Sequence, residues 1–201
     1  MIYLDNAATT FKKPINVIEA INHALTSYGN SGRGAYRAAL DSGRMVYETR
    51  EKISKFFGSS DPSKVIFTSN ATEGLNIVLF GLFGSGDHVI STVTEHNSVL
   101  RPLYKLEKTK NIDIDFIGID ESGKLKYDEF EKHIKENTKA IIVNHVSNVS
   151  GEIADIEYIG EIAKKNNLYV VEDACQAIGA KYKDKMIGSL SDIACFSFFP
   201  T

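Results

Sequence analysis

The stretch Leu168-Tyr169-Val170-Val171-Glu172-Asp173 is a short apolar run that ends in two acidic residues. A run of this length is typical of a strand that is buried on both faces of a parallel sheet. The pattern predicts a buried strand over 168–171. Asp173 then stands at the carboxyl end of that strand, which is the edge where open parallel sheets bind their ligands.

Outward from this strand, short β-branched runs alternate with longer amphipathic segments, as in parallel strands joined by crossover helices. The sequence therefore predicts an α/β fold, with a mainly parallel sheet flanked by helices. Further strands are expected at 65–67, 88–90, 112–117, 140–143 and 193–197, after a short extended start at 2–4. Helices are expected from Pro14 to about Gly29 and over 38–57, 72–83, 98–106, 127–134 and 156–165.

Length and composition narrow the class of protein. The 201 residues are 43% hydrophobic and 24% charged with a net charge of −3, which is ordinary for a globular protein and does not favour nucleic acid as a partner. The longest apolar runs are far shorter than a membrane span of about 20 residues. Lysine clusters such as Lys108, Lys110 and Lys164-Lys165 are expected to be solvated.

The chain shows no linker or internal repeat. We therefore expect one sheet-centred domain over 61–201, preceded by a helical arm of the same domain over 1–60. Its two cysteines are too few for a disulfide framework, and its first residues have no signal-peptide pattern, so a cytoplasmic location is expected.

The turn Thr68-Ser69-Asn70-Ala71-Thr72-Glu73-Gly74 lies between a predicted strand and a predicted helix. Free backbone N–H groups and the helix dipole favour a phosphate there, and Thr72 adds a hydroxyl donor. Such residues at a helix start are also common simply as N-caps. NAD and ATP are disfavoured because the sequence has neither a Walker motif nor a strand-linked G-x-G-x-x-G.

Three further polar residues follow predicted strands. Asp173 could hold the nitrogen of a pyridine ring protonated, although a helix-capping Asp is an alternative. His96 could lie over an aromatic ring, or be a surface residue. Asn148 could donate to a phenolic oxygen, or only form a turn. Their convergence on one edge of the sheet favours a common site.

Several motifs, in order and spacing, resemble those of pyridoxal-phosphate (PLP) enzymes of aminotransferase class V, and most closely those of cysteine desulfurases. The resemblance covers residues 1–171. The motifs are Tyr3-Leu4-Asp5-Asn6-Ala7-Ala8-Thr9-Thr10, Asn30-Ser31-Gly32-Arg33-Gly34, Phe67-Thr68-Ser69-Asn70-Ala71-Thr72-Glu73, Glu95-His96-Asn97-Ser98-Val99 and Asn144-His145-Val146-Ser147-Asn148-Val149-Ser150-Gly151.

The resemblance implies the large domain of a fold type I enzyme, PLP as cofactor, a homodimer, cysteine as substrate and a sulfur-acceptor protein as partner. The cofactor contacts it implies are Ala71 and Thr72 at the phosphate, His96 over the ring, Asp173 at the ring nitrogen, and Asn148 and Gln176 near the phenolic oxygen. No metal ligand is implied.

Residues 172–201 look instead like sugar aminotransferases of the DegT/StrS type, through Glu172-Asp173-Ala174-Cys175-Gln176-Ala177-Ile178-Gly179-Ala180 and the segment from Gly188 to Thr201. In that pattern Ser197 contacts the cofactor phosphate, and the lysine that binds the cofactor covalently directly follows Thr201. The absence of this lysine has two alternative explanations. The lysine carries the cofactor covalently and the printed sequence stops just before it, or the chain is a shortened one.

Both families also need a C-terminal small domain, and desulfurases need a loop cysteine in their C-terminal half; neither is present. Cys175 and Cys195 are expected to be structural thiols rather than that nucleophile. The sequence predicts a desulfurase-like PLP enzyme that is inactive if the polypeptide ends at Thr201. A sugar aminotransferase-like protein and a non-catalytic dimerisation or binding module are the alternatives.

Overall fold

A computed structural model describes residues 2–4 and 10–199. Part of the first motif, at residues 5–9, and Thr201 lie outside the described residues. The chain divides into two compact units, residues 1–66 with 199–201 and residues 67–198. The division falls between Ile66 and Phe67.

The first unit is helical. Its elements are α1 (Ile15–Ser27), α2 (Arg37–Phe56) and the 3-10 turn η1 (Pro62–Lys64). The Ser42 hydroxyl, on α2, links the two helices because it donates to the carbonyl of Gly29 and accepts from the Gly29 N–H, each over 2.9 Å. Both helices begin and end within a residue or two of the predicted positions.

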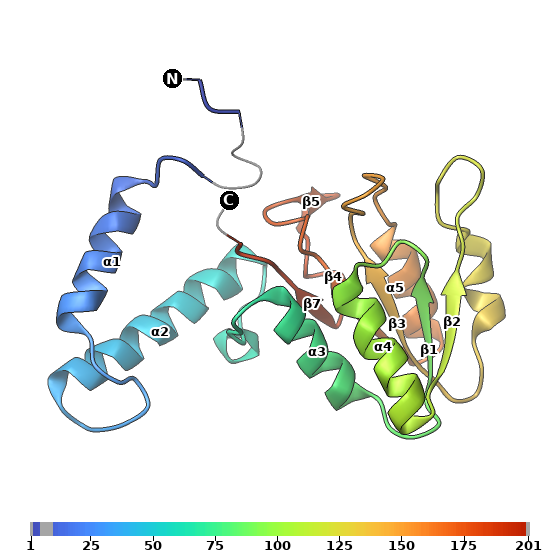
Figure 1. The fold of residues 1–201 in the computed structure, drawn as a ribbon, viewed down its shortest axis with the longest axis horizontal. Helices are drawn as coiled ribbons and strands as arrows, with labels where there is room; N and C mark the ends of the chain where they lie inside the picture. The colour runs from blue at the N-terminus through green and yellow to red at the C-terminus, as the bar shows by residue number, and fades with distance from the viewer. Residues whose placement is uncertain (1, 5–9, 200–201) are drawn as a thin grey trace. The chain divides into compact units, whose positions relative to one another are not determined.

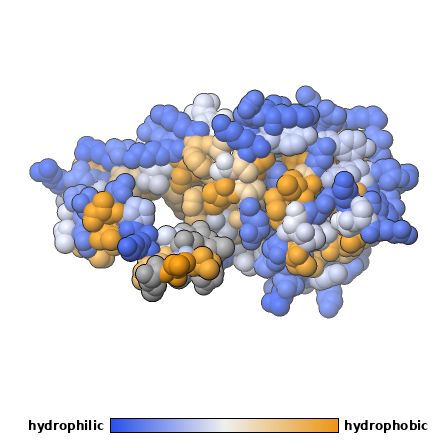
Figure 2. All heavy atoms as spheres, turned by 90° about the horizontal axis from the view of Figure 1, so that it is seen from above, coloured by the Kyte–Doolittle hydropathy of each residue, from blue (hydrophilic) through white to orange (hydrophobic). Residues whose placement is uncertain are grey.

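Helix α1 carries an apolar face that remains exposed. None of its residues is buried, and Ile15, Ile18, Ile21 and Leu25 are between 44% and 80% exposed. On the side of the molecule drawn in Figure 2, hydrophobic side chains likewise reach the surface among hydrophilic ones. An amphipathic helix with this exposure has an apolar stripe that no other described part of the first unit covers.

The second unit contains a five-stranded parallel sheet in the order β2-β1-β3-β4-β7. The prediction of a mainly parallel α/β sheet is therefore confirmed. Its strands are β1 (His88–Thr92), β2 (Asp113–Ile117), β3 (Thr138–Asn144), β4 (Tyr169–Asp173) and β7 (Ile193–Cys195). A separate hairpin, β5 (Lys181–Tyr182) with β6 (Lys185–Met186), was not predicted.

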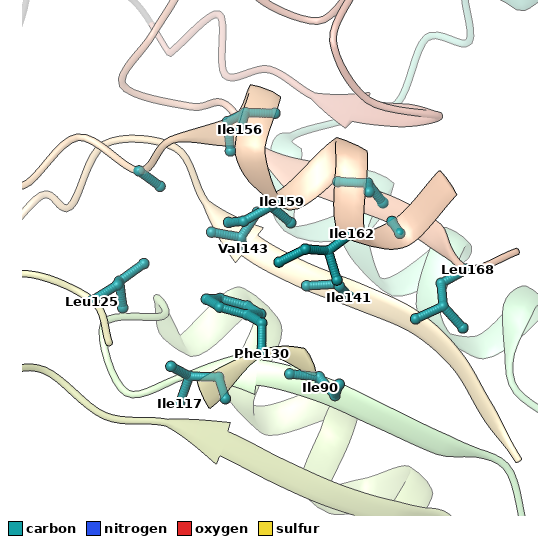
Figure 3. Close-up of a cluster of buried hydrophobic side chains, with 13 residues drawn as sticks. Ile90, Ile117, Leu125, Phe130, Ile141, Val143, Ile156, Ile159, Ile162 and Leu168 are labelled. Atoms are coloured by element: carbon teal, nitrogen blue, oxygen red, sulfur yellow. The ribbon is translucent and has the colours of Figure 1, made fainter. Parts of the chain in front are cut away.

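Helices cover both faces of this sheet (Figure 1). Helices α3 (Ala71–Leu82) and α4 (Asn97–Lys110) pack on one face and α5 (Ile156–Lys165) on the other. On the α5 face, Phe130 lies among Ile90, Ile117 and Ile141 with its side chain fully buried (Figure 3). Figure 3 also shows Ile159 and Ile162 reaching the same cluster from α5.

Two predicted elements are wrong. Residues 65–67 are not part of a strand, although Val65 has extended backbone, because strand composition alone does not determine a strand and β-propensity depends strongly on tertiary context. Residues 127–134 form two 3-10 turns, η2 (Tyr127–Glu129) and η3 (Glu131–His133), rather than an α-helix. A segment of eight residues is too short for a stable α-helix without tertiary support.

Lys110 is partly buried, whereas the sequence predicted a solvated side chain. Its ammonium group donates to the carbonyl oxygens of Phe80 and Phe83, over 3.1 and 2.6 Å. These carbonyls belong to the C-terminal end of α3, where helical C=O groups lack partners and the dipole favours a cation. The lysine at the end of α4 therefore stabilises the end of α3.

Candidate active site

The candidate site lies at the carboxyl edge of the sheet and wholly within the second unit. Crossover helices run antiparallel to the strands, so α3 and α4 begin at the edge where β1, β3 and β4 end. Thr72, His96 and Asp173 are therefore all carried to this edge, as the sequence predicted. Side-chain alternation along β4 puts Val171 and Asp173 on the face covered by α3 and α4.

The start of α3 has the geometry of a capped helix with free donors. The side chain of Asn70 accepts from the Glu73 N–H over 2.9 Å, and the Glu73 carboxylate accepts in turn from the Ser69 N–H. The hydrogen bonds from Ser69 to the Glu73 carboxylate lower the pKa of Glu73. The N–H groups of Ala71 and Thr72 belong to the first turn, where no intrahelical acceptor exists, and the Thr72 side chain is exposed. An anion can therefore bind at these two amides.

His96 is the N-cap of α4, and this fixes its ring. Its Nδ1 accepts from the Ser98 N–H over 3.1 Å and lies 2.8 Å from the Ser98 hydroxyl. A ring held through Nδ1 has a defined orientation, while the residue itself is exposed at the sheet edge. The capping role and the role over an aromatic ring are thus compatible.

Asp173 ends β4 and is 2% exposed. One of its oxygens, Oδ1, accepts from the Cys175 N–H over 3.2 Å, and its backbone carbonyl accepts from the His145 N–H over 3.0 Å. A buried carboxylate favours a cationic group nearby.

Glu95 is a site residue that sequence reasoning missed. It is 7% exposed, and its Oε1 accepts from the Thr92 hydroxyl over 2.7 Å and from the Asn144 N–H over 2.9 Å. Burial, with a smaller contribution from the charge of Asp173, raises the pKa of Glu95 to about 8 against the lowering effect of the two hydrogen bonds. Its other oxygen, Oε2, is buried and has no hydrogen-bond partner among residues 2–4 and 10–199. Its place directly before His96 is the signal that could have found it.

The other three predicted cofactor contacts lie on segments that leave the same edge. Asn148 is exposed at the tip of the loop that follows β3, and Gln176 is exposed in the turn after β4. Ser197 lies two residues beyond the end of β7, whereas the sequence predicted that the strand would include it. All three belong to the same compact unit, and each comes from a different strand end.

The two cysteines have the properties of structural thiols. Cys195 is buried at the end of β7, and burial raises its pKa to about 12. Burial also raises the pKa of Cys175, with a further contribution from the charge of Asp173. Thiols with raised pKa values are poor nucleophiles at neutral pH. Within the described residues, no group of three or more His, Cys, Asp or Glu side chains is placed to hold a metal.

These features fit a phosphorylated pyridine cofactor. Free amides can bind its phosphate, an oriented imidazole can cover its ring, and the buried Asp173 carboxylate matches a ring N–H. The unpartnered Oε2 of Glu95 is a further polar atom at this edge. Fold and site together define the large, cofactor-binding domain of a fold type I protein.

The chain belongs to the aminotransferase class-V family, whose model matches residues 2–197. Members of this family are PLP-dependent. The match runs through residue 172, where the sequence was expected to change to the sugar-aminotransferase pattern.

The most informative relatives are cysteine desulfurases. A probable cysteine desulfurase of Methanothermobacter thermautotrophicus is 35% identical over 198 residues, which is 97% of this chain and 48% of that protein. The structure of apo cysteine desulfurase from Thermococcus onnurineus NA1 superposes with a TM-score of 0.77 at 35% identity, over 87% of this chain and 44% of that one.

A third similar structure is described as SspA in complex with cysteine, with a TM-score of 0.81 and 26% identity over 95% of this chain and 55% of that one. The chain thus spans about half the length of the curated relatives it matches. Among the described residues, no helix is long and apolar enough to cross a bilayer.

Proposed function

We propose that this chain is the cofactor-binding part of a PLP-dependent cysteine desulfurase, an enzyme that removes sulfur from L-cysteine and leaves L-alanine. The observation that carries the proposal is the convergence of the α3 N-terminus, His96 and Asp173 on one sheet edge. The similarity to cysteine desulfurases over nearly the whole chain supports it.

Each residue would have a distinct part in holding the cofactor. The amides of Ala71 and Thr72, with the Thr72 hydroxyl, would bind the phosphate, because a helix N-terminus favours an anion. His96 would lie against the ring, and Asn148 and Gln176 would approach its phenolic oxygen. Ser197 would add a phosphate contact at the end of β7.

Asp173 would hold the proton on the ring nitrogen. PLP, when bound, supplies an electron sink for a carbanion on the amino-acid substrate, and that sink is strongest when its ring nitrogen is protonated. A carboxylate buried at the strand end, in a low-dielectric setting, stabilises this proton more than one in water would. Glu95, whose pKa is raised mainly by burial and further by the charge of Asp173, would lie behind this contact.

For the 201-residue chain by itself, we expect non-covalent binding of PLP without turnover, because the described site offers no lysine to bind the cofactor covalently. Absorbance titration with PLP, with borohydride reduction and peptide mapping, tests this expectation. Saturable binding without a lysine adduct is the expected result; sulfide release from L-cysteine by this chain alone would contradict it.

The decisive variant is Asp173→Asn, which keeps the side-chain shape but removes the charge. We expect its dissociation constant for PLP to rise at least tenfold. Asp184→Asn, at the exposed turn between β5 and β6, is the matched control and should bind as the wild type does. Equal affinity in all three proteins, or no saturable binding in the wild type, would refute the proposal and favour a non-catalytic binding module.

The sugar-aminotransferase resemblance of residues 172–201 gives the alternative activity, transfer of an amino group to a keto-sugar. An assay of the whole protein with L-cysteine and with a glutamate and keto-sugar pair distinguishes the two. Sulfide release supports the desulfurase assignment, and amino transfer without sulfide release overturns it.

We also propose that the whole protein acts as a homodimer in the cytoplasm and passes sulfur to an acceptor protein. The exposed apolar face of α1 supports the dimer, because surfaces of this kind are commonly buried in assemblies. Light scattering of the wild type and of Ile18→Lys tests this: a dimer that the variant dissociates is expected, and a monomeric wild type would contradict it.

A further inference from the structure

Glu172 is a fully buried carboxylate that the proposed function does not use. It lies in β4 directly before Asp173, and side-chain alternation puts it on the opposite, α5 face of the sheet. Each of its oxygens has a partner: Oε1 lies 2.6 Å from Nδ1 of His145, and Oε2 accepts from the Ser191 hydroxyl over 2.8 Å. An apolar side chain would fill this space at lower desolvation cost. The presence of a carboxylate here is therefore not explained by stability alone.

The first partner, His145, begins the loop that carries Asn148. Its N–H donates to the carbonyl of Asp173 over 3.0 Å, and its own carbonyl accepts from Ala154, at the far end of the loop, over 2.8 Å. The ring bond to Glu172 adds a third attachment at the same residue. The base of this loop is therefore fixed to β4 through both the backbone and the side chain of one buried histidine.

The second partner, Ser191, lies in the segment that leads into β7 and Ser197. The neighbouring Asp192 carboxylate accepts from the Val170 N–H over 2.8 Å, so this segment runs along β4. Nearby, Gly188 has φ +92°, and a Cβ there would approach the ring of Phe196 to 2.7 Å. The segment is thus held to β4 and passes close to Phe196, the residue just before Ser197.

We propose that Glu172 is a positioning residue, whose carboxylate clamps the Asn148 loop and the Ser197 segment to the strand that carries Asp173. One side chain would then set the relative placement of three cofactor contacts that come from three different strand ends. This inference rests on the proposed function, because it concerns how the PLP contacts are held together.

The chemistry of the clamp explains why a carboxylate is suited to it. His145, with the proton on Nδ1, and Ser191 both present donors, and a carboxylate supplies two acceptor oxygens in a fixed geometry. Glutamine has the same shape and can accept from one partner while its amide donates to the serine oxygen. Alanine can make neither bond and would leave the buried imidazole unpaired.

The test removes one bond at the edge of the clamp, where folding is least at risk. Ser191→Ala deletes the hydroxyl that donates to Oε2. Ser189→Ala is the matched control, since its hydroxyl belongs to the same segment but donates to the Met186 carbonyl. Hydrogen exchange by mass spectrometry, without cofactor, is compared for peptides covering 144–154, 187–198 and α4, and PLP affinity is measured by absorbance titration.

In Ser191→Ala we expect about tenfold faster exchange in both peptides that the clamp joins, and about tenfold weaker PLP binding, the effect of one hydrogen bond to a charged group. Exchange in α4 should not change, and Ser189→Ala should match the wild type. Glu172→Gln should retain near-wild-type exchange, and Glu172→Ala should exceed Ser191→Ala in both effects.

The inference is overturned if Ser191→Ala and Ser189→Ala show the same hydrogen-exchange rates and the same affinity for PLP. It is also overturned by faster exchange spread equally over α4, since this would indicate only a loss of global stability. If no protein binds PLP but exchange rises in the two joined peptides alone, the clamp is supported and the proposed function fails.

Discussion

Replacing Glu95 with glutamine should make the protein more stable, and increasingly so as pH rises. The folded state raises the pKa of Glu95 from 4.5 to about 8 because the carboxyl is buried at the ends of β1 and β3. A raised pKa means that the folded state holds the proton more tightly than the unfolded state. The stability contributed by the protonated form is therefore present in full below about pH 4.5 and is lost as pH rises toward 8.

The magnitude follows from the two pKa values. A difference of one pKa unit corresponds to about 1.4 kcal/mol, so the free energy of unfolding should fall by about 3 kcal/mol between pH 5 and pH 8 through this one group. The substituted amide cannot ionise, but its oxygen can still accept from Thr92 and from the Asn144 N–H. The free energy of unfolding of the variant minus that of the wild type should consequently grow by about 3 kcal/mol between pH 5 and pH 8 and level off above pH 8.

Urea unfolding followed by circular dichroism, at intervals from pH 5 to pH 9, measures this difference. The contributions of all other ionisable groups are common to both proteins and cancel. Glu161→Gln, on the exposed side of α5, is the control and should give a flat profile, because that side chain stays in water when the chain folds. A pH-independent difference for Glu95→Gln would refute the argument, since it would show that Glu95 is ionised in the folded state throughout.

Three shorter predictions concern the rest of the second unit. Phe130→Ala removes a fully buried ring from the α5-side core and should cost about 3–5 kcal/mol of unfolding free energy in urea, whereas a loss below about 1 kcal/mol would show that the site collapses around the gap. Lys110→Met deletes the cation at the C-terminal end of α3 and should cost about 1–2 kcal/mol, with the exposed Lys108→Met as a control of no effect; equal losses would contradict the capping role. At pH 8, iodoacetamide should modify Cys195 much more slowly in the native protein than in urea, because burial raises its pKa to about 12, and equal rates would contradict this.

Much of the candidate site could be predicted from the sequence because strand ends and helix starts are local signals. Asp173 follows an apolar run, and Thr72 and His96 stand where amphipathic periodicity begins, so parallel topology alone carries them to one edge. Glu95 and Glu172 could not be assigned roles in this way. Their properties depend on Asn144, His145 and Ser191, which are distant in sequence and become neighbours only when β1, β3, β4 and β7 pair.

The sequence by itself determined the class of fold, the order of most strands and helices, and the family, because these depend on hydrophobic periodicity and on short motifs. Tertiary structure decided which of the predicted strands and helices form. Residues 65–67 have strand composition but do not form a strand, and residues 127–134 tighten into 3-10 turns while Phe130 is buried in the core. Burial likewise decided the protonation of Glu95 and the attachment of Lys110 to α3, since desolvation and hydrogen bonding depend on neighbours that only the folded chain brings together.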